Sequence, residues 1–337
     1  MNRLYKLVFL LFLFSFFLVF DTSAQGFPKK YKYWSVGATL NTMNYVGELD
    51  PGPSFISPGI KFTRYNFGAT VTRRMGTRVS LRGTLSYGRI GGNDFVNSTY
   101  SYKGGPHADI RRKSRNLEFF NNILEIKGDV VIDFIEHRGK YQKRPDFVPY
   151  MFVGLAYFHQ DPKAKADLGL GDGEKVYKLR DYHTEGQGTG ISGAPKEYSL
   201  NQIALPIGLG LRYKLGPQWD LAFEMGWRFT TTDYLDDAGG KYPDAQQLYN
   251  ATGSLESVLL SNKSALVSGD QNFSGLSQNQ QTIVLKDGST KTITTLGDDY
   301  SGSSNRGDRK GRRDAYIVTG FHLTYIIPTK VICPKFR

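Results

Sequence analysis

Large apolar residues occupy every second position in two neighbouring stretches of the chain, 203–213 and 221–229. Charged and small residues fill most of the positions between them. A period of two is typical of a β-strand, and Gly216, Pro217 and Gln218 supply a tight turn between the two stretches. Each stretch has about the 9–11 residues that a tilted strand needs to cross a bilayer. The pattern therefore predicts a hairpin with one face in lipid.

The same alternation recurs along the rest of the chain. It is found in residues 34–41, 60–72, 78–90, 117–135, 148–158 and 315–327. The stretch 148–158 is apolar on both faces, so its pattern leaves open which face meets lipid. Exposed strand edges are untenable in lipid, which favours closure of the sheet. Together the eight stretches predict an all-β fold, an eight-stranded antiparallel transmembrane β-barrel of the outer-membrane type.

The connections between the predicted strands alternate in length. Long loops span residues 42–58, 92–115, 160–198 and 236–313, and short turns span residues 74–78, 137–147 and 216–218. Outer-membrane barrels have long extracellular loops and short periplasmic turns. The alternation therefore predicts that both termini are periplasmic, including the tail formed by residues 328–337.

The last long loop, 236–313, has signs of structure of its own. Asp287 and Gly288 stand between two β-prone runs, and Asp-Gly in that context is a strong hairpin signal. Short helices are predicted at residues 243–248 and 255–260. Residues 261–280 are rich in Ser, Asn, Gln and Gly, a composition that predicts a mobile segment.

The N-terminus has the layout of an export signal. Arg3 and Lys6 precede an apolar run, 7–20, and small residues follow it. This layout predicts a secretory signal peptide at 1–24 and a mature barrel at 25–337. A permanent membrane anchor is the weaker interpretation, because the run is shorter than the roughly 20 residues that a spanning helix requires. Export of a barrel indicates the outer membrane of a Gram-negative cell.

Composition narrows the classes of function. The chain has 38 Gly, 21 Tyr and 22 Phe and a negative mean hydropathy, which suits a barrel whose polar lumen residues dilute the lipid-facing ones. Its single cysteine, Cys333, excludes an internal disulfide framework or a cysteine-rich metal site. The formal net charge is +12. For an exported protein, anionic lipopolysaccharide or an acidic protein is a better counter-charge than nucleic acid.

Several charged residues occupy positions that should face the lumen. They are Arg82, Glu125, Lys127, Asp129, Arg212, Glu224 and Arg228. An acid–base site is one interpretation. A barrel of eight strands, however, must fill and neutralise its interior with side chains, which favours a structural ion network. The five histidines stand far apart without metal-ligand spacing, so no catalytic, cofactor or metal site is expected.

Basic residues cluster at both ends of the predicted barrel. At the outer rim are Arg111, Arg112, Lys113, Arg115, Arg309, Lys310, Arg312 and Arg313. These residues predict contacts with the phosphates of lipopolysaccharide. On the periplasmic side, Arg138, Lys140, Lys143 and Arg144 lie in the longest turn, and Lys330, Lys335 and Arg337 lie in the tail. The periplasmic cluster is either a solvated turn or a docking surface for an acidic partner.

Certain blocks resemble a known family. They are YVGEL at 45–49, YSLNQIALPIGLG at 198–210, FEMGWR at 223–228, TDYLDD at 232–237 and ICPK at 332–335. These blocks resemble the PorG-like outer-membrane barrels of the type IX secretion system. The resemblance covers most of the mature chain and is dense in these blocks. It implies a non-enzymatic barrel that associates with a periplasmic ring, formed by a lipoprotein and its partner, and that supports protein export and, in some bacteria, gliding.

Other functions and one specific contact remain open. A lone cysteine in an oxidising compartment is either buried and inert or paired with another chain, so Cys333 is a candidate for a disulfide to the periplasmic ring. A generic OmpA/OmpX-like structural barrel or an adhesin is the main alternative function, although the tripeptide at 306–308 is a chance match to an adhesion motif. A barrel enzyme that modifies lipid A is a further alternative, with His159 as its candidate residue.

Overall fold

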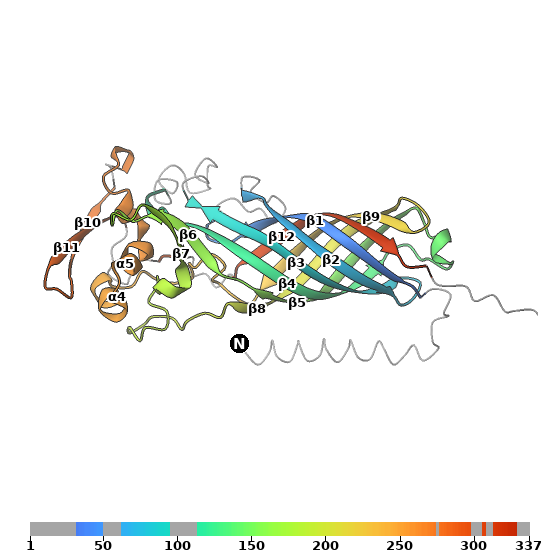
Figure 1. Cartoon of the computed structure of the whole chain (residues 1–337), viewed down its shortest axis with the longest axis horizontal. Helices are drawn as coiled ribbons and strands as arrows, with labels where there is room; N and C mark the ends of the chain where they lie inside the picture. Colours follow the sequence, from blue (N-terminus) through green and yellow to red (C-terminus); the bar gives the residue numbers. More distant parts are fainter. Residues whose placement is uncertain are drawn as a thin grey trace, which may run out of the picture.

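Eight antiparallel strands close into a barrel, as predicted (Figure 1). They are β1 (Trp34–Val46), β2 (Arg64–Arg74), β3 (Val79–Asn93), β4 (Glu118–Asp133), β5 (Phe147–His159), β8 (Asn201–Lys214), β9 (Trp219–Thr230) and β12 (Ala315–Ile326). The first strand pairs with the last, from Ser35 opposite Ile326 to Val46 opposite Ala315. The computed structural model describes residues 32–49, 62–94, 113–273, 276–297, 305–307 and 313–328.

Alternate side chains point outward and inward along each strand, because successive Cβ atoms of a strand lie on opposite faces. The outer face is apolar and exposed, as at Leu40, which is 70% exposed. On β5, Leu155 and Tyr157 are exposed, whereas Phe152 and Phe158 are buried in the lumen. The structure thus settles the strand whose pattern was apolar on both faces. The exposed apolar belt is the surface that a transmembrane barrel presents to lipid.

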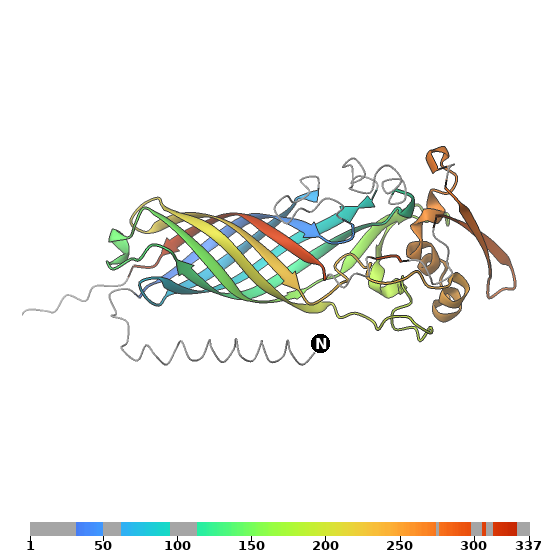
Figure 2. The same cartoon turned by 180° about the vertical axis from the view of Figure 1, so that it is seen from behind.

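Elements beyond one end of the barrel form a cap, built from the two longest loops (Figures 1 and 2). It contains β6 (Pro162–Asp167), β7 (Glu174–Lys178), η4 (Leu179–Tyr182), α4 (Ala245–Thr252), α5 (Leu255–Ser261), η5 (Lys263–Leu266), η6 (Gln271–Phe273), β10 (Gln278–Val284) and β11 (Thr290–Leu296). We call this end the loop end and the opposite end the turn end. The predicted hairpin at Asp287 and Gly288 and the two short helices are confirmed, whereas the β6–β7 hairpin, which extends the sheet beyond β4, was not predicted.

Part of the segment 261–280, which was predicted to be mobile, is packed against the rest of the cap. Lys263, Ser264 and Phe273 are buried. Polar side chains of this segment accept hydrogen bonds from backbone amides. Asn262 Oδ1 accepts a hydrogen bond from the Ser264 amide, and Ser264 Oγ accepts one from the Leu296 amide. Composition alone did not reveal these partners, which lie partly on a distant strand.

The turn end is simpler. Short turns join β2 to β3 and β8 to β9, and the β4–β5 connection contains the 3-10 helix η3 (Tyr141–Lys143). Within the described residues, no helix is long and apolar enough to cross a membrane. The predicted signal peptide and the tail residues Lys330, Cys333, Lys335 and Arg337 lie outside the described residues, as do Arg111, Arg112, Arg309, Lys310 and Arg312.

Candidate functional site

The middle of the lumen holds a compact ion network. Arg82 and Asp129 are directly opposite each other on β3 and β4, and Arg82 Nη2 lies 3.0 Å from Asp129 Oδ2. Arg82 also contacts Glu224 across the barrel, and Lys127 Nζ lies 2.6 Å from Asp129 Oδ2. All four side chains are buried. Since Arg228 Nε faces Glu125 at 3.7 Å, three cations face three carboxylates in this layer.

Three uncharged or weakly basic side chains complete this network. Tyr150 donates a hydrogen bond to Glu224 Oε1 at 2.5 Å, and Tyr316 donates one to Glu125 Oε2 at 2.5 Å. His322 Nδ1 lies 3.1 Å from Glu224 Oε1. Sequence reasoning missed these residues as members of the network. The alternation of the strands could have revealed them, because Tyr150, Tyr316 and His322 each lie at an inward-facing position.

Arg212 belongs to a separate cluster at the turn end of the lumen. Its two terminal nitrogens contact Asp133 at 3.0 and 3.1 Å, and Arg74 contacts the same carboxylate. A polar cavity of about 50 Å³ separates this cluster from the central network. It has room for roughly three or four water molecules. The lumen is therefore filled by side chains, as expected for a barrel of this size.

Arg144 differs from its expected role as a docking residue, because it is only 6% exposed. Its guanidinium contacts Asp220 Oδ1 at 2.7 Å and donates to the carbonyls of Gly216, Pro217 and Trp219. These bonds fasten the β8–β9 turn to the β4–β5 turn. Exposed carbonyls of a tight turn are good partners for a planar guanidinium with five donors. Arg144 thus stabilises the contact between the two turns, and its buried guanidinium is not accessible to a partner protein.

The remaining cations of this turn are exposed. Arg138 has a side chain that is 79% exposed and lies 3.0 Å from Glu136. Lys140 directly precedes the 3-10 helix η3, Lys143 is the last residue of this helix, and both are exposed. We call Arg138, Lys140 and Lys143 the basic turn. They present a positive surface at the turn end, opposite the cap.

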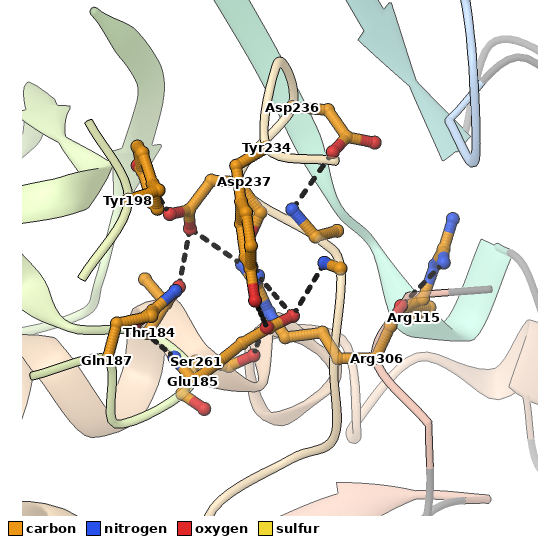
Figure 3. Close-up of polar contacts among 12 residues, drawn as sticks. Arg115, Thr184, Glu185, Gln187, Tyr198, Tyr234, Asp236, Asp237, Ser261 and Arg306 are labelled. Carbon is orange, nitrogen blue, oxygen red and sulfur yellow. Dashed lines mark hydrogen bonds and ion pairs between the residues drawn. The ribbon is translucent and has the colours of Figure 1, made fainter. Parts of the chain in front are cut away.

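A buried arginine holds the cap together (Figure 3). Arg306 is 2% exposed, and its guanidinium lies 3.3 Å from Asp237 Oδ2 and 3.4 Å from Glu185 Oε1. Its Nε donates to the Ser261 carbonyl at 3.0 Å. Because Glu185 precedes β8, Asp237 follows β9 and Ser261 ends α5, one side chain joins three separate segments. Because its guanidinium is buried, Arg306 is not exposed for recognition as part of an adhesion tripeptide.

Aromatic residues enclose the two carboxylates that face Arg306. Tyr198 donates to Asp237 Oδ1 at 2.8 Å and Tyr234 donates to Glu185 Oε2 at 3.3 Å. Their rings stack at a centroid distance of 4.8 Å. Burial raises the pKa of Glu185 to about 7 and also raises the pKa of Asp237, although Arg306 opposes both shifts. The two acids therefore depend on Arg306 for their charged forms.

Three further carboxylates converge beside this cluster. Tyr45 Oη lies 2.7 Å from Asp236 Oδ2, 2.9 Å from Asp314 Oδ1 and 3.5 Å from Glu48 Oε2. We call Glu48, Asp236 and Asp314 the acid trio. Their oxygens lie within 4.8 Å of one another, a spacing that a divalent cation would accept. One phenolic hydrogen serves three carboxylates, so shared protons also account for the arrangement.

The acid trio makes the cap sensitive to pH. Burial and mutual repulsion raise the pKa of Glu48 to about 8 and that of Asp314 well above its usual range, and burial raises the pKa of Asp236 to about 7. A folded state with raised carboxyl pKa values binds more protons than the unfolded state, so its stability falls as pH rises. We expect the trio's stabilisation of the cap to be present below about pH 4.5 and lost as pH rises through about 7 to 8.

Hydrogen exchange of the Leu235 amide, which donates to Asp314 Oδ2, measures this effect. After correction for intrinsic rates, protection should be greater at pH 5.5 than at pH 8.5. Asp314→Asn should remove most of the difference, whereas Asp146→Asn, at an exposed carboxylate, should leave it intact. Protection that increases with pH would contradict the assignment.

Two other candidate positions differ from expectation. Arg115, predicted to meet lipopolysaccharide, instead contacts Asp94 at 2.7 Å and donates to the Arg306 carbonyl at 2.9 Å. Arg115 therefore joins the rim of the barrel, next to β3 and β4, to the cap residue Arg306. His159 is exposed at the end of β5, and its Nδ1 lies 2.9 Å from Asn201 Oδ1. In the described part of the chain, no Ser or acidic side chain forms a hydrogen bond or ion pair with His159.

No protein-family model matches the chain, and no curated protein matches it in sequence. Solved structures of similar shape include Neisserial surface protein A, at 9% identity, 87% coverage of this chain, 96% of that chain and a TM-score of 0.34. Outer membrane protein OprG from Pseudomonas aeruginosa is 9% identical, with 90% of this chain and 99% of that chain covered and a TM-score of 0.35. A major outer membrane protein from Thermus thermophilus is 11% identical, with 88% of this chain and 99% of that chain covered and a TM-score of 0.31. The fold itself rests on the strand pairing described above.

Proposed function

We propose that this barrel is a non-enzymatic component of the type IX protein secretion system. In this proposal it lies in the outer membrane with its turn end and both termini in the periplasm, and lipopolysaccharide surrounds its loop end. It anchors or organises the periplasmic ring, formed by a lipoprotein and its partner, for protein export. The mature chain begins after the signal peptide at 1–24.

The observation that carries the proposal is the convergence of separate blocks of the resemblance at one place. Tyr45 and Glu48 come from the block 45–49, and Asp236 comes from the block 232–237. In the cap they meet at Tyr45 Oη, 2.7 Å from Asp236 and 3.5 Å from Glu48. Tyr198, from a third block, bonds to Asp237 of the second at 2.8 Å. Residues that form one buried cluster constrain one another, which supports a common family architecture.

The basic turn supplies a docking surface for the ring. Arg138, Lys140 and Lys143 are exposed on the longest turn, on the side that faces the periplasm in this proposal. Opposite charges on two surfaces speed their encounter and fix their register more than they add affinity. A complementary acidic patch on the lipoprotein or its partner is therefore expected.

Charge reversal of the basic turn tests this function. The triple variant Arg138→Glu, Lys140→Glu, Lys143→Glu should lower recovery of ring proteins by roughly tenfold after cross-linking in cells, because each exposed pair contributes up to about 1 kcal/mol and reversal adds repulsion. Export of type IX cargo should fall as well. The matched control reverses Lys178, Lys196 and Lys286, which are exposed at the loop end, and should leave both readouts unchanged. Unaltered cargo export in cells that lack the protein would refute the proposal.

Cys333 is proposed as a covalent link to the ring, since a lone cysteine in an oxidising compartment can pair with another chain. Non-reducing gels of cells whose thiols were blocked before lysis should then contain an adduct that Cys333→Ser removes.

The main alternative function is a structural barrel or an adhesin. Its distinguishing result would be loss of adhesion, with export intact, after removal of residues 276–297.

A further inference from the structure

The outer wall of the barrel carries an apolar groove of about 690 Å³. It crosses strands β2 to β5 and continues to β8. Its lining includes Ala69, Gly83, Leu85, Ile126, Gly128 and Leu155. These residues belong to the exposed apolar belt, so the medium that reaches the groove is the hydrocarbon of the membrane.

Two glycines create the groove. Gly83 and Gly128 are directly opposite each other on β3 and β4. A Cβ at Gly128 would meet no atom within 4 Å, and one at Gly83 would meet only the Val71 carbonyl, at 4.0 Å. By contrast, a Cβ at Gly154 would lie 2.1 Å from a backbone oxygen. Barrel packing therefore requires glycine at Gly154 but not at the two groove positions, where the missing side chains leave a recess.

A cation lies above the groove on the same two strands. Arg89 and Asn122 are directly opposite each other, six residues nearer the loop end than Gly83 and Gly128. Arg89 Nε donates to Asn122 Oδ1 at 2.7 Å, and its guanidinium lies 4.8 Å from the Phe120 ring centroid. Within the described residues, the hydrogen-bonding partner of the Arg89 side chain is Asn122 and not a carboxylate. Its terminal N–H groups are thus available to an anion, and a guanidinium binds phosphate in a bidentate way.

The distance between cation and groove matches one membrane leaflet. Six residues span about 20 Å along a strand. A strand tilt of roughly 40° converts this length to a drop of about 15 Å across the membrane. Since the hydrocarbon core is about 30 Å thick, one leaflet is about 15 Å deep. A lipid whose phosphate binds Arg89 would therefore extend an acyl chain to the level of Gly83 and Gly128.

We propose that the β2–β5 wall binds one phosphate-bearing lipid of the leaflet on the loop side. Its phosphate contacts Arg89, and one acyl chain lies in the groove at Gly83 and Gly128. The occupant is a lipid because the groove combines an apolar lining with a cation at headgroup depth. This site goes beyond the proposed secretion function, and the choice of lipid A as its lipid rests on the orientation proposed above, with the loop end in lipopolysaccharide.

Native mass spectrometry of the full-length protein, released from detergent with added lipid A, tests the proposal. The wild type should retain one lipid A more strongly than chemically dephosphorylated lipid A. Gly128→Leu fills the groove and should reduce retention of both lipids. Arg89→Gln should weaken binding of lipid A by about tenfold and abolish the preference for the phosphorylated form. Because a Cβ at Gly128 would meet no atom within 4 Å and the leucine would lie on the lipid-facing side of β4, the barrel should fold, and Gly83→Ala provides a milder second variant.

The control is Thr319→Leu, which adds a leucine to the opposite wall, where Thr319 pairs with Met225. It should bind lipid A as the wild type does. Equal loss in this control, or full retention in Gly128→Leu, would overturn the proposal. A dimer that Gly128→Leu dissociates would also overturn it, because the groove would then be an interface between two copies of the chain.

Discussion

Arg82→Met is expected to destabilise the barrel by about 3–5 kcal/mol, because it removes one partner of a buried ion network and leaves the other charges uncompensated. Glu224 and Asp129 both contact Arg82 in the lumen, and after its removal Lys127 is the cation that still contacts Asp129. Urea unfolding in detergent, followed by tryptophan fluorescence and by the gel mobility of the folded barrel, measures the loss.

The matched control is Arg73→Met. Arg73 is exposed near the turn end, with its guanidinium 5.0 Å from the Trp34 ring centroid, so the same substitution there should change stability by less than about 1 kcal/mol. Combining Arg82→Met with Glu224→Gln should recover part of the loss, because it removes one of the stranded charges. Equal effects of the two arginine substitutions would mean that the lumen network contributes no stability.

The barrel could be predicted from the sequence because each strand carries its own signal. In a sheet with one face in lipid, alternation with a period of two is imposed on every spanning strand. The same alternation assigns Arg82, Lys127 and Asp129 to the lumen. The alternation did not show which face of β5 meets lipid, because the lumen side of that strand also carries apolar residues such as Phe152 and Phe158.

The hairpin and the two short helices of the cap could be predicted, but the contacts that hold the cap together could not, because they join segments far apart in the chain. Arg306 joins Glu185 and Asp237, 121 and 69 positions away. The tripeptide around Arg306 has no period or spacing that would mark it as a buried junction. Arg144 misled for a similar reason, since its burial depends on the carbonyls of a turn more than 70 positions later in the chain. A pattern within a short stretch of sequence does not show which distant residues a side chain will contact.

Arg306→Met is expected to loosen the cap while the barrel stays folded. The substitution leaves Glu185 and Asp237 buried without their cation, a change that costs about 3–5 kcal/mol when both remain charged. Burial already raises the pKa of both carboxyls, and loss of Arg306 raises these pKa values further. The two groups then bind protons as pH falls, which restores part of the stability. The defect should therefore be larger at pH 8.5 than at pH 5.5.

Hydrogen exchange in residues 184–198 and 234–240 measures this loosening, and protection of β3 and β4 reports on the barrel in the same experiment. Arg313→Met, at an exposed position beside the cap, should leave both regions unchanged. Adding Glu185→Gln to Arg306→Met should restore part of the protection at pH 8.5, because only one carboxyl, that of Asp237, then remains buried without a cation. If protection of the two cap segments is unchanged in Arg306→Met, the buried guanidinium does not hold them together, and the cap must be stabilised by its apolar contacts alone.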